Sequence, residues 1–311
     1  MFIKNFKELS YKNVDIAGGK GASLGEMAQN KFPIPPGFVV LASAFDKFLE
    51  ETDLNVEIEA AIKEIRHDDV HSVEEVSDKI KDMIMDEKMP EDIEKEIMAN
   101  FKKLGAKFVA VRSSATAEDS SVASWAGELE SYLNTIEKNL LETVKKCWAS
   151  LFTPRAIVYR FEKNLQDQKV SVAVVIQKMI QSEVSGICFT VHPVTTDKTQ
   201  MIIESGWGLG EAIVGGMITP DTVVLDKRDL SIMDINISEQ RMMITRTPKG
   251  TKEVVVPKEK QEKQKLDGKK LIDLAKICLE IEKHYKKPQD IEWAVEKNKI
   301  YITQSRPITT L

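Results

Sequence analysis

The chain has 311 residues, of which 42% are hydrophobic and 30% are charged, as in an ordinary globular protein with a sizeable core. Its formal net charge of -5, without clustered basic residues, argues against a nucleic-acid-binding surface. No apolar run approaches the roughly 20 residues needed to span a bilayer, and residues 1–5 lack the start of a signal peptide, so we expect a cytoplasmic protein with no membrane partner.

The first half of the chain is mostly helical in pattern. Apolar residues recur at helical spacing within residues 54–103, which predicts helices there. A buried strand is predicted at residues 108–111, where four apolar residues run together. Helices are predicted again at residues 136–150 and from Pro154, because Thr153 is a good N-cap and proline suits the first helical turn.

The second half changes to strand-like patterns. Short apolar runs separated by Gly, Pro, Asp and Thr predict strands at residues 171–177, 186–191, 200–204 and 222–226. One more helix is predicted around residues 271–281, whose apolar positions share a face. A final hairpin is predicted to start at Pro288.

A glycine-rich segment surrounds Lys20. In residues 17–25, Gly18, Gly19 and Gly21 flank the lysine, so the backbone can approach an anion while the ammonium adds a compact charge. The spacing differs from that of a Walker A loop. A glycine-rich turn before a helix explains the same residues, so for this segment alone both interpretations stay open.

A second candidate segment follows the strand predicted at residues 108–111. Arg112 stands there, ahead of hydroxyl-bearing and small residues that continue to Gly127. A guanidinium at the end of a buried strand suits a forked contact to phosphate, beside a loop that closes over it. An ion pair of Arg112 with Glu118 or Asp119 explains the same pattern, so here too both interpretations stay open.

The final hairpin is predicted to bring Glu292 and Gln304 together. Side chains alternate along each strand, so if residues 297–299 form the loop, with Asn298 helping to make the turn, Glu292 lies opposite Gln304 on one face. A two-residue turn would put them on opposite faces, so we predict an odd-length loop. Their oxygens suit Mg2+, and Arg306 is placed to reach a terminal phosphate. A structural pair of Glu292 and Arg306 is the open alternative.

Five segments occur in an order and spacing typical of one family. They are the Gly-Gly-Lys-Gly loop, the Val-Arg-Ser-Ser-Ala-Thr-Ala-Glu-Asp stretch, and residues 177–186, 204–212 and 304–307. With them the chain resembles the N-terminal ATP-binding domain of phosphoenolpyruvate synthase and pyruvate phosphate dikinase. It is similar also to the matching domain of rifampin phosphotransferase. The resemblance covers essentially the whole chain.

The resemblance implies an α+β protein with the ATP-grasp fold, in which two lobes hold the nucleotide in the cleft between them. Residues 1–176 would form the N-terminal lobe, with the Gly-rich and Arg-bearing phosphate loops. Residues 177–311 would form the C-terminal lobe, with the adenine, metal and terminal-phosphate residues. ATP and Mg2+ are the implied cofactors.

The resemblance also implies roles for individual residues. Those expected to contact the phosphates and act in catalysis are Lys20, Arg112 and Arg306. Those expected to hold or support Mg2+, two of them also contacting ATP, are Glu211, Glu292 and Gln304, with Asp290 behind them. The remaining ATP-binding residues would be Gly127 and Ser131 on a lid segment, Gln177, Lys178 and Met179 at the adenine, and Glu183 at the ribose.

By the same resemblance, the complete reaction passes a phosphoryl group from ATP to a histidine on a separate swivelling domain, and from there to an acceptor. None of the four histidines has the Gly-rich context of such a residue. We therefore expect an ATP-dependent phosphotransferase of the dikinase type that is incomplete without a phosphohistidine domain and a pyruvate- or phosphoenolpyruvate-binding domain. A rifampin phosphotransferase-like antibiotic kinase and a non-catalytic ATP-binding regulatory module are the open alternatives.

Overall fold

The fold is that of a computed structural model, which describes residues 1–66, 68–116, 130–163, 165, 170–247 and 250–308. The chain divides into two compact units. The first unit comprises Met1–Gln29 and Pro36–Met179, and the second comprises Asn30–Pro35 and Ile180–Leu311. The division after Met179 lies close to the boundary expected after residue 176, but the sequence did not predict that residues 30–35 belong to the second unit. No helix in the described ranges is long and apolar enough to cross a membrane.

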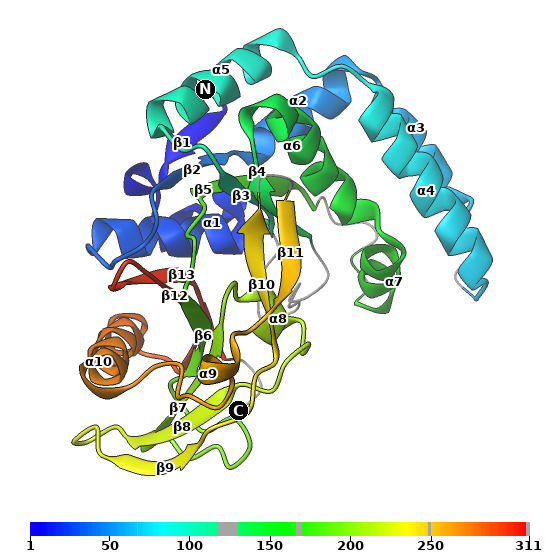
Figure 1. The fold of residues 1–311 in the computed structure, drawn as a ribbon. Helices are drawn as coiled ribbons and strands as arrows, with labels where there is room; N and C mark the ends of the chain where they lie inside the picture. Colours follow the sequence, from blue (N-terminus) through cyan, green and yellow to red (C-terminus); the bar gives the residue numbers. More distant parts are fainter. Residues whose placement is uncertain (67, 117–129, 164, 166–169, 248–249, 309–311) are drawn as a thin grey trace. The chain divides into compact units, whose positions relative to one another are not determined.

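The first unit is built on a five-stranded antiparallel sheet with the order β1-β2-β5-β3-β4 (Figure 1, blue to green). Its strands are β1 (Ile3–Asn5), β2 (Gly37–Val40), β3 (Val109–Ala115), β4 (Ser131–Thr135) and β5 (Val172–Lys178). Its helices are α1 (Val14–Gln29), α2 (Ala42–Glu51), α3 (Leu54–Lys63), α4 (Val70–Asp86), α5 (Glu91–Leu104), α6 (Leu140–Ala149) and α7 (Pro154–Glu162).

Most helices of this unit follow the predicted pattern. Residues 54–103 form α3, α4 and α5, and the apolar face of α5 is buried at Ile93, Ile97 and Phe101. The Thr153 side chain accepts a hydrogen bond from the N–H of Ala156, which confirms it as the N-cap of α7. The packing of these apolar faces explains why the helices form at the predicted places.

The two faces of the first sheet pack against different helices. Val109, Val111 and Ala115 of β3 belong to one large core, which also holds Trp148 of α6 stacked on Phe45 of α2. The intervening residues of β3 point to the other face. That face carries α1, which contacts both β3 and β5.

The second unit is built on a six-stranded antiparallel sheet with the order β13-β12-β6-β7-β8-β9 (Figure 1, yellow to red with part of the green). The strands are β6 (Val184–Phe189), β7 (Gln200–Trp207), β8 (Asp221–Asp226), β9 (Ile232–Asn236), β12 (Gln289–Glu296) and β13 (Lys299–Pro307). A separate hairpin and three helices complete it: β10 (Met242–Thr247), β11 (Gly250–Val255), α8 (Glu211–Val214), α9 (Lys258–Gln261) and α10 (Gly268–Tyr285).

Helix α10 covers one face of this sheet. The thiol of Cys278 on α10 contacts that of Cys188 on β6, and Cys188 pairs with Ile291 of β12. All three side chains are fully buried. Because neighbours on a strand point to opposite faces, Asp290 and Glu292 of β12 lie on the face away from α10.

The segment Asn30–Pro35 adds to the edge of the second unit. The carbonyl of Pro33 accepts a hydrogen bond of 2.8 Å from the N–H of Ile302 on β13. The ring of Phe32 lies edge-on to that of His284 on α10, with their centroids 6.0 Å apart. These contacts explain why this short stretch belongs to a unit that is otherwise formed by residues after 179.

Candidate functional site

The glycine-rich segment forms a broken helix around Lys20. Gly18 has φ 68°, which interrupts α1, and the helix resumes with Lys20 in its first turn. A Cβ atom at Gly18 would lie 2.2 Å from the carbonyl oxygen of Ser114, so no other residue fits without movement. The break therefore places half-buried Lys20 at the start of a helix, where backbone N–H groups favour an anion.

Ser114 fastens this helix start to β3. Its hydroxyl donates to the carbonyl of Ala17 at 2.9 Å and accepts from the N–H of Gly21 at 3.1 Å. Arg112 lies two residues before Ser114 on β3, so both side chains point to the α1 side of the sheet. The sequence indicated no role for Ser114, because its contact to Ala17 joins residues 97 positions apart.

The structure corrects the expected surroundings of Arg112. We expected the strand to end there, yet β3 continues to Ala115. It continues because its serines have buried partners: Ser113 donates to the carbonyl of Glu130 at 2.9 Å, and Ser114 bonds to α1. Ser131 of β4 pairs directly with Arg112, so these two expected ATP-binding residues are neighbours on one face. Gly127 lies outside the described residues.

The expected adenine residues lie at the end of β5. The N–H groups of Lys178 and Met179 donate to the carbonyls of Pro36 and Phe108, at 2.9 and 3.0 Å, and are therefore already used. Gln177 is only 3% exposed, and its side-chain nitrogen has no hydrogen-bond partner among the described residues. A buried amide donor without a partner is costly, so Gln177 is suited to an acceptor supplied by a ligand.

The closing hairpin confirms one prediction and corrects another. Glu292 pairs with Gln304 as predicted. The turn, however, has two residues, Lys297 and Asn298, both with positive φ as in a type I′ turn, so the predicted odd-length loop is wrong. A bulge nevertheless brings Glu292 opposite Gln304. Trp293 pairs with Ile302, so Thr303 is the extra residue on β13 before Gln304. Asn298 is a turn residue, as predicted.

Two polar pairs stand side by side on β12 and β13. Gln304 donates through Nε2 to Oε1 of Glu292 at 3.1 Å. Two positions further along both strands, Arg306 donates through Nε and a terminal nitrogen to one oxygen of Asp290, at 2.9 and 2.7 Å. Burial raises the pKa of Asp290, and this effect outweighs the opposing effect of the Arg306 charge. The two hydrogen bonds hold the Arg306 guanidinium against Asp290.

Glu211 stands at the start of α8 and is exposed. Helix α8 contacts β6 and β7, and a Cβ atom on Gly206 of β7 would lie 3.0 Å from the side chain of Ile213. Gly206 pairs with Ser185, which pairs with Ala294 of β12, so α8 lies on the same sheet face as Glu292. The second unit thus gathers its expected metal and phosphate residues on the face away from α10.

Glu183 has a structural partner that the sequence did not predict. Its carboxylate accepts a hydrogen bond of 2.9 Å from the N–H of Lys297, in the turn between β12 and β13. In return, the carboxylate of Glu296 accepts from the N–H of Gln181 at 2.9 Å. Glu183 therefore stabilises the end of the hairpin. Any contact to a ribose would involve a carboxylate that already accepts this hydrogen bond from Lys297.

The oxygen donors of the second unit fit Mg2+ as part of its ligand shell. Within the described ranges, no group of three or more His, Cys, Asp or Glu side chains could hold a metal ion by themselves. Mg2+ commonly takes one or two protein ligands and completes its shell with phosphate and water. The adjacent carboxylate of Glu292 and amide of Gln304 match that requirement.

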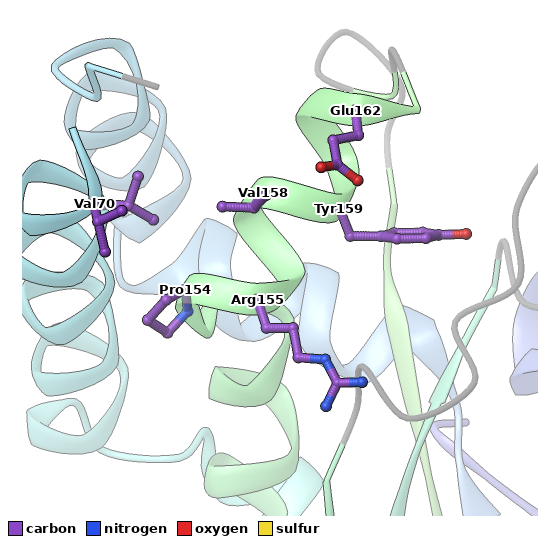
Figure 2. Close-up of a pocket in the computed structure, with 7 residues that line it drawn as sticks. Val70, Pro154, Arg155, Val158, Tyr159 and Glu162 are labelled. Atoms are coloured by element: carbon purple, nitrogen blue, oxygen red, sulfur yellow. The ribbon is translucent and has the colours of Figure 1, made fainter. Parts of the chain in front are cut away.

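A cavity of about 320 Å³ lies elsewhere in the first unit, between α4 and α7. Figure 2 shows Pro154 and Val158 on the side of α7 that faces Val70, with Arg155 and Tyr159 pointing away from Val70. None of the expected site residues lines it. Its walls are mainly apolar, and the two charged residues that line it, Arg155 and Glu162, have opposite signs, so it does not suit a polyphosphate.

Comparisons with known proteins agree with the five motifs. Residues 14–311 match the family described as pyruvate phosphate dikinase, AMP/ATP-binding domain. The chain is 46% identical over 318 residues to a probable phosphoenolpyruvate synthase of Methanocaldococcus jannaschii, a match that covers 100% of this chain and 27% of that protein. It is 46% identical over 310 residues to a probable phosphoenolpyruvate synthase of Archaeoglobus fulgidus, covering 98% of this chain and 41% of that protein.

A third relative is the phosphoenolpyruvate synthase of Pyrococcus furiosus, 39% identical over 358 residues, covering 100% of this chain and 44% of that protein. The chain thus spans less than half the length of these relatives. The resemblance deduced from the sequence motifs is confirmed. The chain belongs to the pyruvate phosphate dikinase family of AMP/ATP-binding domains.

Proposed function

We propose that this ATP-binding domain holds Mg-ATP in the manner of an ATP-grasp protein, with the two units as its lobes and the nucleotide in the cleft between them. It would serve a phosphoenolpyruvate synthase-like dikinase, passing a phosphoryl group from ATP to a histidine on a separate swivelling domain. A pyruvate- or phosphoenolpyruvate-binding domain would complete the reaction. The length of the relatives, more than twice that of this chain, is consistent with such further domains.

The gathering of charged groups within each unit carries this proposal. In the first unit, Ser114 fastens the start of the Lys20 helix to the strand that bears Arg112. In the second, Glu292, Gln304 and Arg306 share one sheet face. Two cations and a helix start suit phosphate oxygens, while the carboxylate and amide suit the metal that accompanies them.

Phosphoryl transfer needs little covalent chemistry from the protein, so these residues would act by position and charge. Lys20 and Arg112 would neutralise phosphate oxygens from the first unit. Arg306, held by Asp290, would contact the terminal phosphate, and Gln177 would donate its buried amide to the base. When bound, Mg2+ would offset charge on the phosphates, with Glu292 and Gln304 as its protein ligands.

Calorimetric titration with Mg-ATP tests the binding site. Lys20→Ala and Arg306→Ala should each weaken binding at least tenfold, since each removes a charge-assisted contact worth roughly 1.5–3 kcal/mol. Lys276→Ala on α10 is the matched control, because this exposed lysine lies on the helix that covers the opposite sheet face. Unchanged affinity in both site variants would reject the assignment.

Transfer of phosphate tests the proposed reaction separately. The chain would be incubated with ATP labelled at the β-phosphate and a histidine-domain protein taken from a complete relative. We expect acid-labile label on that protein, and none with the Arg306→Ala variant. ATP binding without any transfer would favour a regulatory module instead of a half-enzyme.

A further inference from the structure

Asn134 on β4 is a buried polar residue that the sequence motifs did not single out. It is 7% exposed, yet neither Oδ1 nor Nδ2 of its amide has a hydrogen-bond partner among the residues that the structure describes. A buried amide that forms none of its hydrogen bonds is costly. Asn134 is therefore suited to a ligand that offers a donor and an acceptor next to each other.

A bulge places Asn134 beside Ala110 of β3. The register between β3 and β4 shifts after Val109, so Leu133 and Asn134 both stand opposite the single residue Ala110. Asn134 has φ 57°, a left-handed conformation that asparagine adopts more readily than most residues. Ala110 is one of the residues of β3 that point to the α1 side of the sheet. Asn134 therefore belongs to that side too.

Gln177 stands on the other side of the same alanine. Ala110 pairs with Gln177 of β5, so two buried amides flank one small side chain on one face. In both, the nitrogen has no hydrogen-bond partner in the described part of the chain. Neighbouring strands lie about 4.8 Å apart, so the backbones of Asn134 and Gln177 are roughly 10 Å apart. A planar base over Ala110 would lie within reach of both amides.

The order of residues along β3 matches the order of groups in a nucleotide. Arg112, expected at the phosphates, lies two residues after Ala110 and pairs with Ser131. Residues that share a face of a strand are roughly 7 Å apart. The two amides thus lie one step along the strand from the phosphate residues, as a base is separated from its phosphates by the ribose.

The chemistry of an asparagine amide favours adenine among the purines. The amide oxygen can accept from the exocyclic amine of adenine while its nitrogen donates to a neighbouring ring nitrogen. Guanine has a carbonyl oxygen in place of that amine, so two acceptors would face each other. The unpartnered oxygen and nitrogen of Asn134 therefore fit adenine and disfavour guanine.

We propose that Asn134 forms two hydrogen bonds to adenine, one with its exocyclic amine and one with an adjacent ring nitrogen, and so makes the site select ATP among purine nucleotides. This inference rests on the proposed function, because it assigns a specificity residue to the same nucleotide site. Asn134 acts beside Gln177, whose amide nitrogen donates to the same base.

Calorimetric titration with three nucleotides tests the role of Asn134. They are the Mg2+ complexes of ATP, GTP and purine riboside triphosphate, which is ATP without the exocyclic amine. In the unchanged protein we expect purine riboside triphosphate to bind about tenfold more weakly than ATP, and GTP at least about tenfold more weakly. Asn134→Gly removes the amide without backbone strain, because glycine adopts φ 57° freely. This variant should bind ATP and purine riboside triphosphate equally.

The ratio of the two affinities separates recognition from a structural effect. A folding defect would weaken both nucleotides by the same factor and leave their ratio unchanged. Asp53→Gly is the matched control, since Asp53 has φ 56° and is exposed between α2 and α3. It should keep both affinities of the unchanged protein.

Asn134→Asp provides a second measurement. Aspartate tolerates the left-handed conformation and keeps an acceptor for the amine, but a carboxylate offers no donor to the ring nitrogen. This variant should bind ATP more weakly than the unchanged protein does, yet still more tightly than purine riboside triphosphate. Equal binding of the two nucleotides by the unchanged protein, or an unchanged ratio in Asn134→Gly, would overturn this inference and leave the proposed function standing. Failure of the unchanged protein to bind ATP would overturn both.

Discussion

Glu292 accepts a hydrogen bond of 3.1 Å from Gln304, although the turn that joins their strands holds two residues. Gln304→Glu would replace the donor by a second carboxylate at this distance. Like charges so close disfavour double ionisation. We expect the free energy of unfolding at neutral pH to fall by about 1–3 kcal/mol without Mg2+, and Mg2+ to restore more stability than it adds to the unchanged protein.

Thermal unfolding with and without Mg2+ measures this effect. Gln304→Met serves as the control, because it removes the donor without adding charge. If Mg2+ stabilised the Met variant as much as the Glu variant, charge repulsion would be the wrong explanation for the instability of the Glu variant.

Substitutions in the turn at Lys297 and Asn298 can raise the stability of the protein, since both residues have positive φ. Asn-Gly is the preferred pair for such a turn. The double change Lys297→Asn with Asn298→Gly should raise the free energy of unfolding by about 0.5–1 kcal/mol in urea titrations.

The chain offers a matched control in the Lys138-Asn139 pair. Asn139 has φ -111°, and its side chain accepts from the N–H of Ile136 at 2.9 Å. The same double change there should lower stability, because glycine loses that hydrogen bond and adds chain entropy to the unfolded state. A gain at both places would contradict the argument from φ.

Gly18 should be intolerant of any side chain. Gly18→Ala brings a Cβ atom 2.2 Å from the carbonyl oxygen of Ser114 at φ 68°, so both a clash and backbone strain result. Gly105→Ala is the comparison, since Gly105 has φ 62° but nothing within 4 Å of its added Cβ.

Strain alone costs about 1–2 kcal/mol, so Gly105→Ala should lose that much stability and keep its Mg-ATP affinity. Gly18→Ala should lose more stability in denaturant titration and also bind Mg-ATP more weakly. Equal losses of stability would show that the contact with Ser114 is relieved by movement.

Asp221 and Lys265 form a fully buried ion pair in the second unit. Lys265 donates through Nζ and its backbone N–H to the two oxygens of Asp221, at 2.7 and 2.8 Å, and both side chains are 0% exposed. Lys265→Met leaves a buried carboxylate without its counterion, and should lower the free energy of unfolding by about 3–5 kcal/mol.

The exposed pair of Glu239 and Arg241 provides the comparison. Glu239→Gln should change stability by only about 0–1 kcal/mol in the same urea titration. A small loss on Lys265→Met would mean that water reaches Asp221 once the lysine is removed.

Glu204 is a half-buried acid on β7 that should make the protein less stable as the pH rises. Burial and the charge of Asp290 raise its pKa above the ordinary 4.5, so the folded protein keeps this proton to a higher pH than the unfolded chain. Its contribution to the free energy of unfolding is therefore largest below pH 4.5 and is lost as the pH rises through the raised pKa.

Glu204→Gln removes this titration. Its stability relative to the unchanged protein should increase with pH across that window, measured by chemical denaturation in a chelating buffer. Asp290 titrates in both proteins, so the difference reports mainly on Glu204. Parallel stability curves would contradict a raised pKa of the half-buried Glu204 carboxylate.

The sequence predicted elements whose signals are local. The helix α7 follows from Thr153 and Pro154, and α10 follows from a single apolar face. Glu292 and Gln304 were placed opposite each other correctly, but through the wrong loop length. Strict alternation of side chains was assumed, and the bulge before Gln304 breaks it. A bulge depends on pairing across the sheet, which short-range patterns do not report.

Other features depend on distant contacts. The strands β9, β10 and β11 were not predicted, since all of β9 and much of β11 is exposed and no apolar alternation marks them. The role of Ser114 requires α1 beside β3, and the surroundings of Glu204 depend on the order of strands in the second sheet. The sequence shows both residues, but it does not show which distant residues lie next to them.

The short stretch Asn30–Pro35 makes the second unit discontinuous in sequence, so no single cut separates the two units. A fragment beginning at Ile180 would leave the N–H of Ile302 without the Pro33 carbonyl, on the strand that carries Gln304 and Arg306. The N-terminal fragment would keep a peptide that belongs to the other unit. Cleavage after Met179 should therefore leave two fragments that stay associated, because residues 30–35 of the first fragment pack on the second.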